Sequence, residues 1–404
     1  MAPTTSTRPQ LAYLGKQLDE LKQKGTYFKL RVLEDECAPE CTFDGKKVIN
    51  LASNNYLGLT THPKLREAAI AATKKYGVGP GAVRTIAGTM SLHMELEEKI
   101  ARFKNVEACV VFQSGFTANA GTVSAILGKE DFIISDELNH ASIIDGARLS
   151  RAKILVFRHK DVAHAEEHLA SVKDQPGNKL LITDGVFSMD GDIGPLPALC
   201  DLAEKYGAIM MVDDAHSSGV LGKNGRGTID HFNVHGRVDI QVGTLSKAIG
   251  AIGGYVCGSR DLIEFLYHRG RPFLFSTSHP PSVTATCIAA FDVLEQEPQL
   301  IEQLWKNTRY FKQELGGLGF NIGGKNTPAS ETPITPIIVG EGRLAMEFSR
   351  ELFKEGVMAT GIAFPTVAEG KARIRTIMTA THTQEQMDRA LEVLGKVGKR
   401  LGIV

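Results

Sequence analysis

Lys247 is the residue whose surroundings best suit it for covalent chemistry. It follows the apolar stretch Val238–Val242 and is flanked by Thr244, Ser246 and several small residues. A lysine at the end of a buried strand loses solvation, which lowers its pKa and frees the amine to form a Schiff base with an aldehyde. Most lysines are instead solvated surface residues. The interpretation therefore depends on which other residues the fold brings to Lys247.

A second candidate is Asp213, which directly follows the apolar run Ala208–Val212 and precedes His216 by three positions. An aspartate at the end of a buried strand is costly unless it is paired, and a protonated pyridine nitrogen is one such partner. Pyridoxal phosphate (PLP) needs a Schiff-base lysine, an acidic partner and a phosphate cradle. We therefore expect PLP as the cofactor, with His216 in reach of the same ring.

The phosphate cradle is predicted where the strand Ala108–Phe112 leads into a helix. Ser114, Gly115 and Phe116 stand at the start of that helix, where backbone N–H groups and a hydroxyl favour an anion. Simple N-capping by Ser114 is an equally good explanation of this segment alone.

His140 and Ser188 follow two further predicted strands, Phe132–Ser135 and Lys179–Thr183. An imidazole at a strand end can stack on a flat ring or transfer protons, although a lone histidine there is more often a hydrogen-bonded loop residue. These candidates all lie at the C-terminal ends of strands, where open α/β sheets bind ligands.

The elements that must position these residues alternate between strand and helix, which is typical of a doubly wound, mostly parallel α/β sheet. With 404 residues the chain is too long for one core, and we expect two domains. Residues 51–285 would form a large cofactor-binding domain and residues 286–404 a small α+β domain. Residues 1–50 would be an N-terminal arm whose amphipathic helix packs on the small domain or on a partner subunit.

Arg373 and Arg375 alternate in a strand predicted near residues 372–378 of the small domain, so they face opposite sides. One of them can point into the cleft and clamp a substrate carboxylate, while the other is solvated.

Composition excludes several other classes of protein. Lys and Arg total 46, as do Asp and Glu, so no charge bias favours nucleic acid or a membrane surface. No apolar run reaches the length of a membrane span, and the N-terminus lacks the apolar core of a secretion signal, so a cytoplasmic protein is expected. The six cysteines show no metal-binding spacing, and we predict neither a metal nor disulfides.

With these residues identified, the chain resembles the α-oxoamine synthases, a family of fold-type-I PLP enzymes, over nearly its whole length. The resemblance runs from Ser53–Gly58 to Arg373–Arg375, and its most specific stretches are Asn139–Gly146, Thr183–Gly191, Val212–His216 and Gly243–Lys247.

The resemblance implies a role for each matched residue. Lys247 would hold PLP as a Schiff base, Asp213 would pair with the ring nitrogen, and His140 would stack on the ring. His216 and Ser188 would contact the phenolic oxygen of PLP. Thr244 and the segment Ser114–Phe116 would bind the phosphate, and Asn54 and Arg375 would bind the carboxylate of the amino acid. Family members are homodimers, and Ser276 and Thr277 would complete the phosphate cradle from the neighbouring subunit.

The implied reaction condenses a small amino acid with an acyl-CoA and releases CoA. Within the family the segments Asp136–Gly146 and Thr183–Gly191 favour members that join glycine to acetyl-CoA. The segment Val83–Thr89 resembles the 8-amino-7-oxononanoate synthases of the biotin pathway, which take alanine and pimeloyl-CoA, and relaxed specificity would cover both. A PLP aminotransferase would share Lys247 and Asp213, whereas a non-catalytic regulatory subunit on this fold would be expected to lack the lysine.

Overall fold

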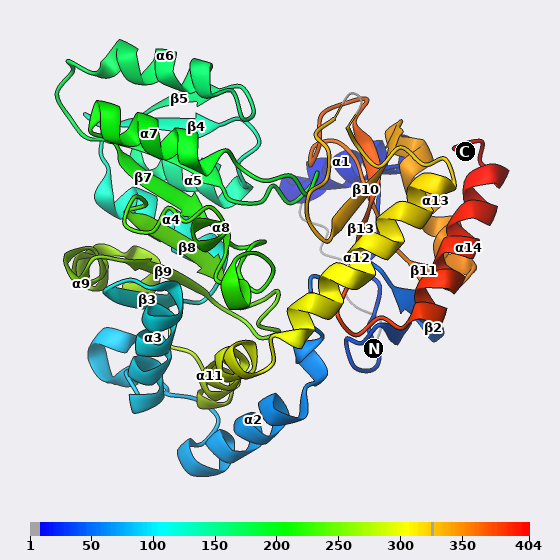
Figure 1. Cartoon of the computed structure of the whole chain (residues 1–404), viewed down its shortest axis with the longest axis horizontal. Helices are drawn as coiled ribbons and strands as arrows, with labels where there is room; N and C mark the ends of the chain where they lie inside the picture. The colour runs from blue at the N-terminus through cyan, green and yellow to red at the C-terminus, as the bar shows by residue number, and fades with distance from the viewer. Residues whose placement is uncertain (1–8, 325–326) are drawn as a thin grey trace.

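The computed structural model describes residues 9–324 and 327–404, so residues 1–8 of the predicted arm lie outside it. Its central element is a seven-stranded sheet with the strand order β3-β9-β8-β7-β6-β4-β5 (Figure 1). The strands are β3 (Ala108–Phe112), β4 (Phe132–Asp136), β5 (Lys153–Phe157), β6 (Lys179–Asp184), β7 (Ile209–Asp213), β8 (Ile240–Thr244) and β9 (Gly254–Gly258). Strands β5, β4, β6, β7 and β8 run parallel, and β9 runs antiparallel to both its neighbours. The predicted doubly wound, mostly parallel α/β fold is confirmed.

Apolar side chains alternate between the two faces of this sheet because successive residues of a strand point in opposite directions. Leu180 and Ile182 of β6 belong to one core with α4 (Gly115–Ile126), α5 (Ala141–Ser150) and α9 (Arg260–Arg269). Leu181 belongs to a second core with α6 (Val162–Val172) and α7 (Leu196–Tyr206). Burial on both faces explains why these strands read as continuous apolar runs.

Two strands of the sheet were not predicted. Strand β5 lies at one edge, and of its residues only Phe157 is buried, so it lacks the apolar run that marks the inner strands. Strand β9 begins and ends with glycine, Gly254 and Gly258, which is typical of a turn rather than a strand. It pairs antiparallel with β8 and so returns the chain from the Lys247 turn.

The C-terminal part carries two three-stranded sheets, β1-β2-β11 and β10-β13-β12. Their bounds are β1 (Glu40–Phe43), β2 (Lys46–Asn50), β10 (Ile334–Gly340), β11 (Val357–Met358), β12 (Thr360–Ile362) and β13 (Ala372–Ile377). Because β2 pairs with β11, the N-terminal strands lie beside the C-terminal third of the chain. The domain boundaries near residues 50 and 285 stay predictions.

The other helices lie around these sheets. They are α1 (Ala12–Gln23), α2 (Pro63–Tyr76), α3 (Ser91–Lys104), α8 (Thr228–His231), α10 (Arg271–Leu274), α11 (Pro281–Gln296), α12 (Gln299–Gly317), α13 (Gly342–Lys354) and α14 (Gln384–Arg400). Within the described ranges no helix combines the length and apolar character that crossing a bilayer requires.

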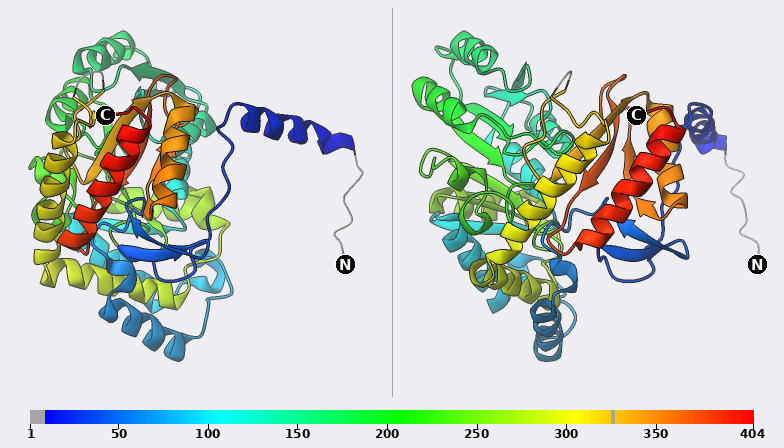
Figure 2. Two further views of the ribbon diagram at one scale, coloured as in Figure 1. Left: turned by 90° about the vertical axis from the view of Figure 1, so that its right-hand side faces the viewer. Right: turned by 45° about the vertical axis from the view of Figure 1, so that its right-hand side comes forward.

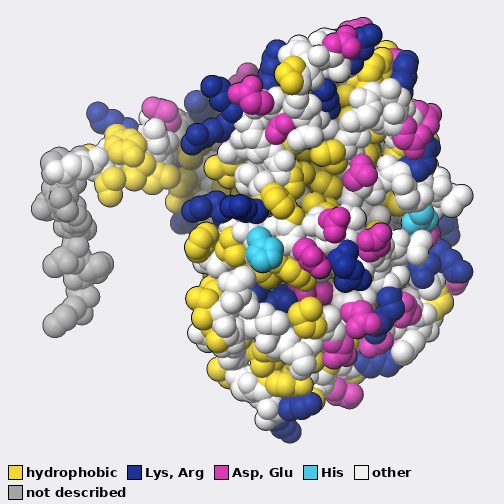
Figure 3. Space-filling model, turned by 90° about the vertical axis from the view of Figure 1, so that its left-hand side faces the viewer, with side chains coloured by type: hydrophobic (Ala, Val, Ile, Leu, Met, Phe, Trp, Pro, Cys, Tyr) yellow, Lys and Arg dark blue, Asp and Glu magenta, His cyan; other side chains and the backbone are white. Residues whose placement is uncertain are grey.

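Helix α1 confirms the predicted amphipathic helix but projects away from the body of the molecule (Figure 2). It has no buried residue, and its stripe of Leu14, Leu18 and Leu21 is exposed, as the apolar side chains along the arm show (Figure 3). The expected packing on the small domain is therefore not made within a single chain. Packing on a partner subunit stays a proposal.

The glycine-rich segment between Gly77 and Gly88 could suit either a ligand or a flexible turn, and the structure shows a packing role. Arg84–Gly88 forms a π-helical turn, and Arg84 pairs with the buried Glu97 at 2.8 Å. A Cβ on Gly88 would lie 2.1 Å from the carbonyl oxygen of Ala82. The glycine therefore permits a close backbone approach within the protein.

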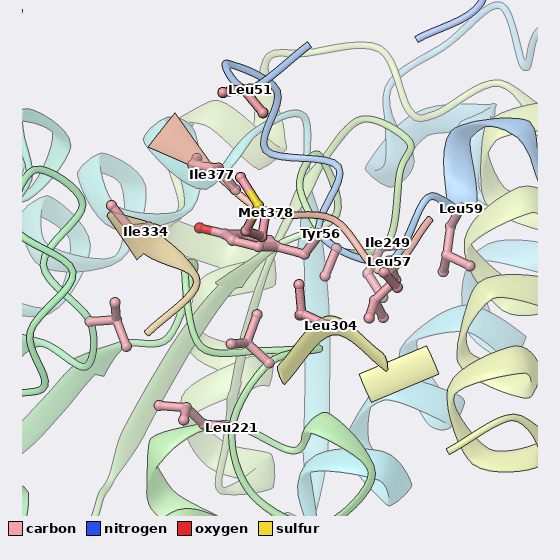
Figure 4. Packing of buried hydrophobic residues seen from close by; sticks show 14 of the residues in the cluster. Leu51, Tyr56, Leu57, Leu59, Leu221, Ile249, Leu304, Ile334, Ile377 and Met378 are labelled. Carbon is pink, nitrogen blue, oxygen red and sulfur yellow. The ribbon is translucent and has the colours of Figure 1, made fainter. Parts of the chain in front are cut away.

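A shared apolar core joins the large sheet to the C-terminal part and fixes the loop after β2. Tyr56, Leu304, Ile377 and Met378 pack together there (Figure 4). The backbone N–H of Ile377 donates to the carbonyl oxygen of Leu51 at 2.8 Å, so this loop lies directly against β13.

Candidate active site

The carboxyl ends of four parallel strands, β4, β6, β7 and β8, meet at one edge of the large sheet. A cavity of about 220 Å³ opens at this edge. The residues that line it are Ser114, Gly115, Phe116, His140, Ser142, Asp184, Val186, Asp213, Ala215, His216, Thr244, Ser246 and Lys247. The structure thus brings together eight residues predicted from the sequence: Ser114, Gly115, Phe116, His140, Asp213, His216, Thr244 and Lys247.

Lys247 lies in the turn that follows β8, and its Nζ makes no hydrogen bond within the described part of the chain. Desolvation lowers the pKa of Lys247 to about 8, against the opposing charge of Asp213, and the charge of Arg375 lowers it further. About a tenth of the amine is therefore neutral at pH 7, far more than for a lysine of ordinary pKa, and Schiff-base chemistry uses this neutral form.

Asp213 is the last residue of β7, and its carboxylate is oriented by two hydrogen bonds. Asn119 Nδ2 donates to Oδ2 at 2.6 Å, and the backbone N–H of Ala215 donates to Oδ1 at 2.9 Å. Asn119 comes from α4 and also donates to Ser142 Oγ at 2.9 Å. The carboxylate is thereby held at the cavity wall, where it can face a cation.

His140 is the N-cap of α5, and its Nδ1 accepts a hydrogen bond from the backbone N–H of Ser142 at 3.2 Å. Because Nδ1 is an acceptor, the proton of the neutral imidazole is on Nε2. Desolvation lowers the pKa of His140; the charge of Asp213 opposes this effect and that of Lys247 adds to it. The ring therefore reaches the cavity as a neutral hydrogen-bond donor.

His216 is buried, and its Nδ1 lies 2.8 Å from the hydroxyl of Tyr56. Burial lowers the pKa of His216 well below its usual value, and the charges of Lys247 and Arg375 lower it further. When Tyr56 donates to Nδ1, the remaining proton of the neutral ring is on Nε2.

The N-terminus of α4 forms one end of the cavity. Ser114 caps this helix by accepting a hydrogen bond from the N–H of Thr117 at 3.1 Å, so the predicted N-cap is present. The helix start also lies against β9, where a Cβ on Gly254 would be 2.4 Å from the carbonyl of Ser114. A helix N-terminus facing a cavity suits a phosphate.

The two arginines of β13 face opposite sides, as predicted. Arg375 Nη2 donates to Asn54 Oδ1, and its charge lowers the pKa of Lys247, although neither Arg375 nor Asn54 lines the cavity. Arg373 was expected to be solvated if Arg375 faced inward. It is instead buried and paired with Asp190, because the loop that follows β6 covers that face of the strand.

Five predicted residues do not line the cavity within a single chain: Asn54, Ser188, Ser276, Thr277 and Arg375. Ser188 lies in the loop after β6, half-buried and outside the lining. Ser276 and Thr277 also lie outside it, and the carbonyl of Thr277 accepts a hydrogen bond from Gln113 Nε2 at 2.9 Å. Their predicted roles therefore stay predictions, and for Ser276 and Thr277 a neighbouring subunit is required.

The sequence analysis missed Asp184, Ser142 and Ser246 as lining residues. For Asp184 a signal was available, because it ends the apolar run of β6 in the same way that Asp213 ends β7. Ser142 and Ser246 carry no such signal, since a single serine in a loop or at a helix start is common.

The chemical groups at the cavity fit PLP. The cavity offers a helix N-terminus for the phosphate, a fixed carboxylate for the ring nitrogen and a desolvated lysine for the aldehyde. Two buried oxygens at the cavity, Asn119 Oδ1 and Asp184 Oδ1, also have no hydrogen-bond partner in the described chain. Such orphaned groups indicate a polar ligand.

Comparison with known proteins agrees with this geometry. Residues 46–394 match the family model described as aminotransferase class I and II. The 8-amino-7-oxononanoate synthase of Thermoanaerobacter pseudethanolicus is 59% identical over 394 residues, covering 98% of both proteins. 8-Amino-7-oxononanoate synthase 1 of Bacillus subtilis strain 168 is 54% identical over 395 residues, covering 98% of this chain and 99% of that protein.

Solved structures similar to this chain include two PLP-family enzymes. A serine palmitoyltransferase of S. paucimobilis with bound PLP and myriocin has a TM-score of 0.92 and 31% identity, covering 98% of this chain and 100% of that one. The 8-amino-7-oxononanoate synthase of Francisella tularensis has a TM-score of 0.71 and 29% identity, and the match covers 87% of this chain and 98% of that one. The chain therefore belongs to the α-oxoamine synthases, PLP-dependent enzymes within the class I and II aminotransferase family.

Proposed function

We propose that the protein condenses alanine with pimeloyl-CoA and releases CoA, carbon dioxide and 8-amino-7-oxononanoate. The observation that carries this proposal is 53–59% identity, over 96–98% of the chain, to relatives named 8-amino-7-oxononanoate synthase. The pairing of glycine with acetyl-CoA, which the sequence analysis favoured, finds no support among these relatives. The resemblance of the short stretch Val83–Thr89 supports the same proposal.

Asp213 would supply the negative charge and Lys247 the base that the reaction needs. When bound, PLP provides an electron sink for the α-carbon of the amino acid. The Asp213 carboxylate, held by Asn119 and Ala215, would pair with the ring nitrogen of PLP and keep it protonated. Lys247 Nζ, with its pKa lowered to about 8, accepts the α-proton of alanine.

Arg375, His140 and His216 would orient the substrates. Arg375, positioned by its hydrogen bond to Asn54, binds the alanine carboxylate with its planar guanidinium. His140 Nε2–H would donate to the thioester carbonyl and stabilise the negative charge that develops on its oxygen when the α-carbon attacks, before CoA leaves. His216 Nε2–H, with its tautomer set by Tyr56, would donate to the phenolic oxygen of the cofactor.

The working protein would be a homodimer whose cavity is completed by the neighbouring subunit. Phe116 and Phe275 support this arrangement, because they are 45% and 70% exposed although large aromatic side chains favour burial. Ser276 and Thr277, which follow Phe275 and lie outside the cavity of their own chain, would reach the phosphate of the partner. Light scattering of the PLP-loaded protein tests the stoichiometry.

The reaction is tested with alanine labelled with ¹³C in its carboxyl group. With pimeloyl-CoA, the label should leave as carbon dioxide, and mass spectrometry should find unlabelled 8-amino-7-oxononanoate. Lys247→Ala is the control and should yield neither product. Retention of the label, or amino transfer to a keto acid without CoA release, would overturn the proposal.

A further inference from the structure

Asp184 and Asp213 end neighbouring parallel strands and are register partners, Asp184 on β6 and Asp213 on β7. Both side chains are buried, with 5% and 6% exposure, and both line the cavity. Two carboxyl groups so close to each other do not ionise independently, because each anion raises the cost of the other.

The surroundings of the two carboxyls differ. Asp213 accepts one hydrogen bond at each oxygen, from Ala215 and Asn119, and these donors stabilise an anion. Asp184 Oδ1 has no hydrogen-bond partner among the described residues. A buried carboxylate with an unpaired oxygen is unfavourable, so the charge belongs on Asp213 and the proton on Asp184.

The backbone on both sides of the Asp184 side chain is fixed. The N–H of Asp184 donates to Asn139 Oδ1 at 2.8 Å, and the N–H of Gly185 donates to the carbonyl of Asp213 at 2.8 Å. Gly185 is tightly enclosed, because a Cβ there would lie 2.5 Å from Thr228 Oγ1. Asp184 is therefore held in place in the wall of the cavity.

The groups that face Asp184 come from every neighbouring element. Burial raises the pKa of Asp184 well above its usual value, and the charge of Asp213 raises it further. The charge of Lys247 opposes this shift, the charge of Asp136 at the end of β4 adds to it, and the backbone N–H of His140 lowers it slightly. The raised pKa of Asp184 and its unpaired oxygen both favour the protonated form of this carboxyl group.

We propose that Asp184 carries a proton in the working protein and presents it to the cavity as a neutral hydrogen-bond donor beside the Asp213 anion. The donor serves an acceptor atom of the bound cofactor. A neutral Asp184 also leaves Lys247 without a second anion that would favour its ammonium form. The proposal rests on PLP occupying this cavity, as in the proposed function, but on no particular amino acid or thioester.

The test compares Asp184→Asn, which keeps the shape and a neutral donor, with Asp184→Ala, which removes both. PLP is titrated into the apo protein, and the dissociation constant and the pH midpoint of the PLP absorption band are measured. The dissociation constant of PLP for Asp184→Asn should lie within about twofold of the parent value, and the pH midpoint of the absorption band should be unchanged. Asp184→Ala should bind PLP about 10-fold more weakly, which corresponds to the loss of one buried hydrogen bond.

Asp213→Asn is the matched control, because it removes a charge rather than a neutral donor, and it should weaken PLP binding more than Asp184→Asn does. Asp184→Asn decides the question even if Asp184→Ala does not fold. A midpoint moved by about one unit or more in Asp184→Asn would show that Asp184 is an anion and overturn the proposal. Parent-like binding by Asp184→Ala would also overturn it. Neither measurement involves turnover, so failure of the alanine and pimeloyl-CoA assignment would leave this result intact.

Discussion

Tyr56 and His216 join two distant segments of the chain through one buried hydrogen bond of 2.8 Å between the tyrosine hydroxyl and Nδ1. Their rings meet edge to face, at an interplanar angle of 87°. Tyr56 comes from the loop after β2, and His216 follows β7, so the bond links the C-terminal part of the core to the cavity. It also fixes which nitrogen of His216 can donate to a ligand.

We expect Tyr56→Phe to weaken PLP binding, because His216 loses the partner that sets its tautomer. The free energy of unfolding should fall by about 1–3 kcal/mol, since Nδ1 is left buried without a partner. Tyr206→Phe is the control, because that hydroxyl bonds Glu166 far from the cavity. PLP titration and denaturant unfolding of both variants check this, and parent-like PLP affinity in Tyr56→Phe would contradict the role given to Tyr56.

Arg375 and Arg373 provide a matched pair on opposite faces of β13. Arg375→Lys should raise the KM for the amino acid about 10-fold or more, because an ammonium cannot reproduce the planar fork of a guanidinium. Arg373→Lys should leave that KM nearly unchanged and lower stability instead, since Arg373 pairs with the buried Asp190. Steady-state kinetics and thermal unfolding separate the two effects. Equal KM values for both variants would rule out carboxylate binding by Arg375.

His159 makes stability depend on pH. Burial alone would lower its pKa, but hydrogen bonds to Asp136 at 3.0 Å and Asp192 at 2.9 Å outweigh burial and raise the pKa to about 9. The folded pKa lies above the unfolded value of about 6.5, so the stabilisation is complete below pH 6.5 and is lost as pH rises to 9.

The expected contribution of His159 is on the order of 3 kcal/mol, from the shift between those two values. His159→Gln should therefore flatten the fall in unfolding free energy between pH 6.5 and 9. Denaturant unfolding across this range measures it, with His231→Gln as a control outside the cluster. An equally steep fall in His159→Gln would assign the pH dependence to other groups.

Gly254→Ala should disturb the phosphate end of the cavity. The added methyl group would lie 2.4 Å from the Ser114 carbonyl and 2.5 Å from the N–H nitrogen of Gly115, so the start of α4 must shift. We expect at least 10-fold weaker PLP binding, because a helix N-terminus binds phosphate only when its N–H groups are correctly placed. Gly79→Ala, where a Cβ meets nothing within 4 Å, should bind PLP like the parent. Normal binding by Gly254→Ala would remove α4 from the phosphate site.

Much of this arrangement could be predicted from the sequence because buried parallel strands leave a strong signal. Their apolar runs end in polar residues, and the ends of parallel strands meet at one edge, which places Asp213, His140 and Lys247 together. The same logic applied to Asp184 would have found it.

Other features depend on tertiary packing that no local pattern records. Strand β9 is bounded by glycines, and β5 is largely uncovered, so neither has the composition of an inner strand. The pairing of Arg373 with Asp190 and of Tyr56 with His216 joins residues more than 150 positions apart. The acyl substrate is set by small differences in pocket shape, each worth only about 1–3 kcal/mol, which residue spacing does not encode.

The most direct measurement of the central claim is the release of free CoA thiol by the PLP-loaded protein with alanine plus pimeloyl-CoA, beside glycine plus acetyl-CoA. The account predicts rapid release with the first pair, much slower release with the second, and none from Lys247→Ala. Faster release with glycine plus acetyl-CoA, or no release with either pair, would contradict it.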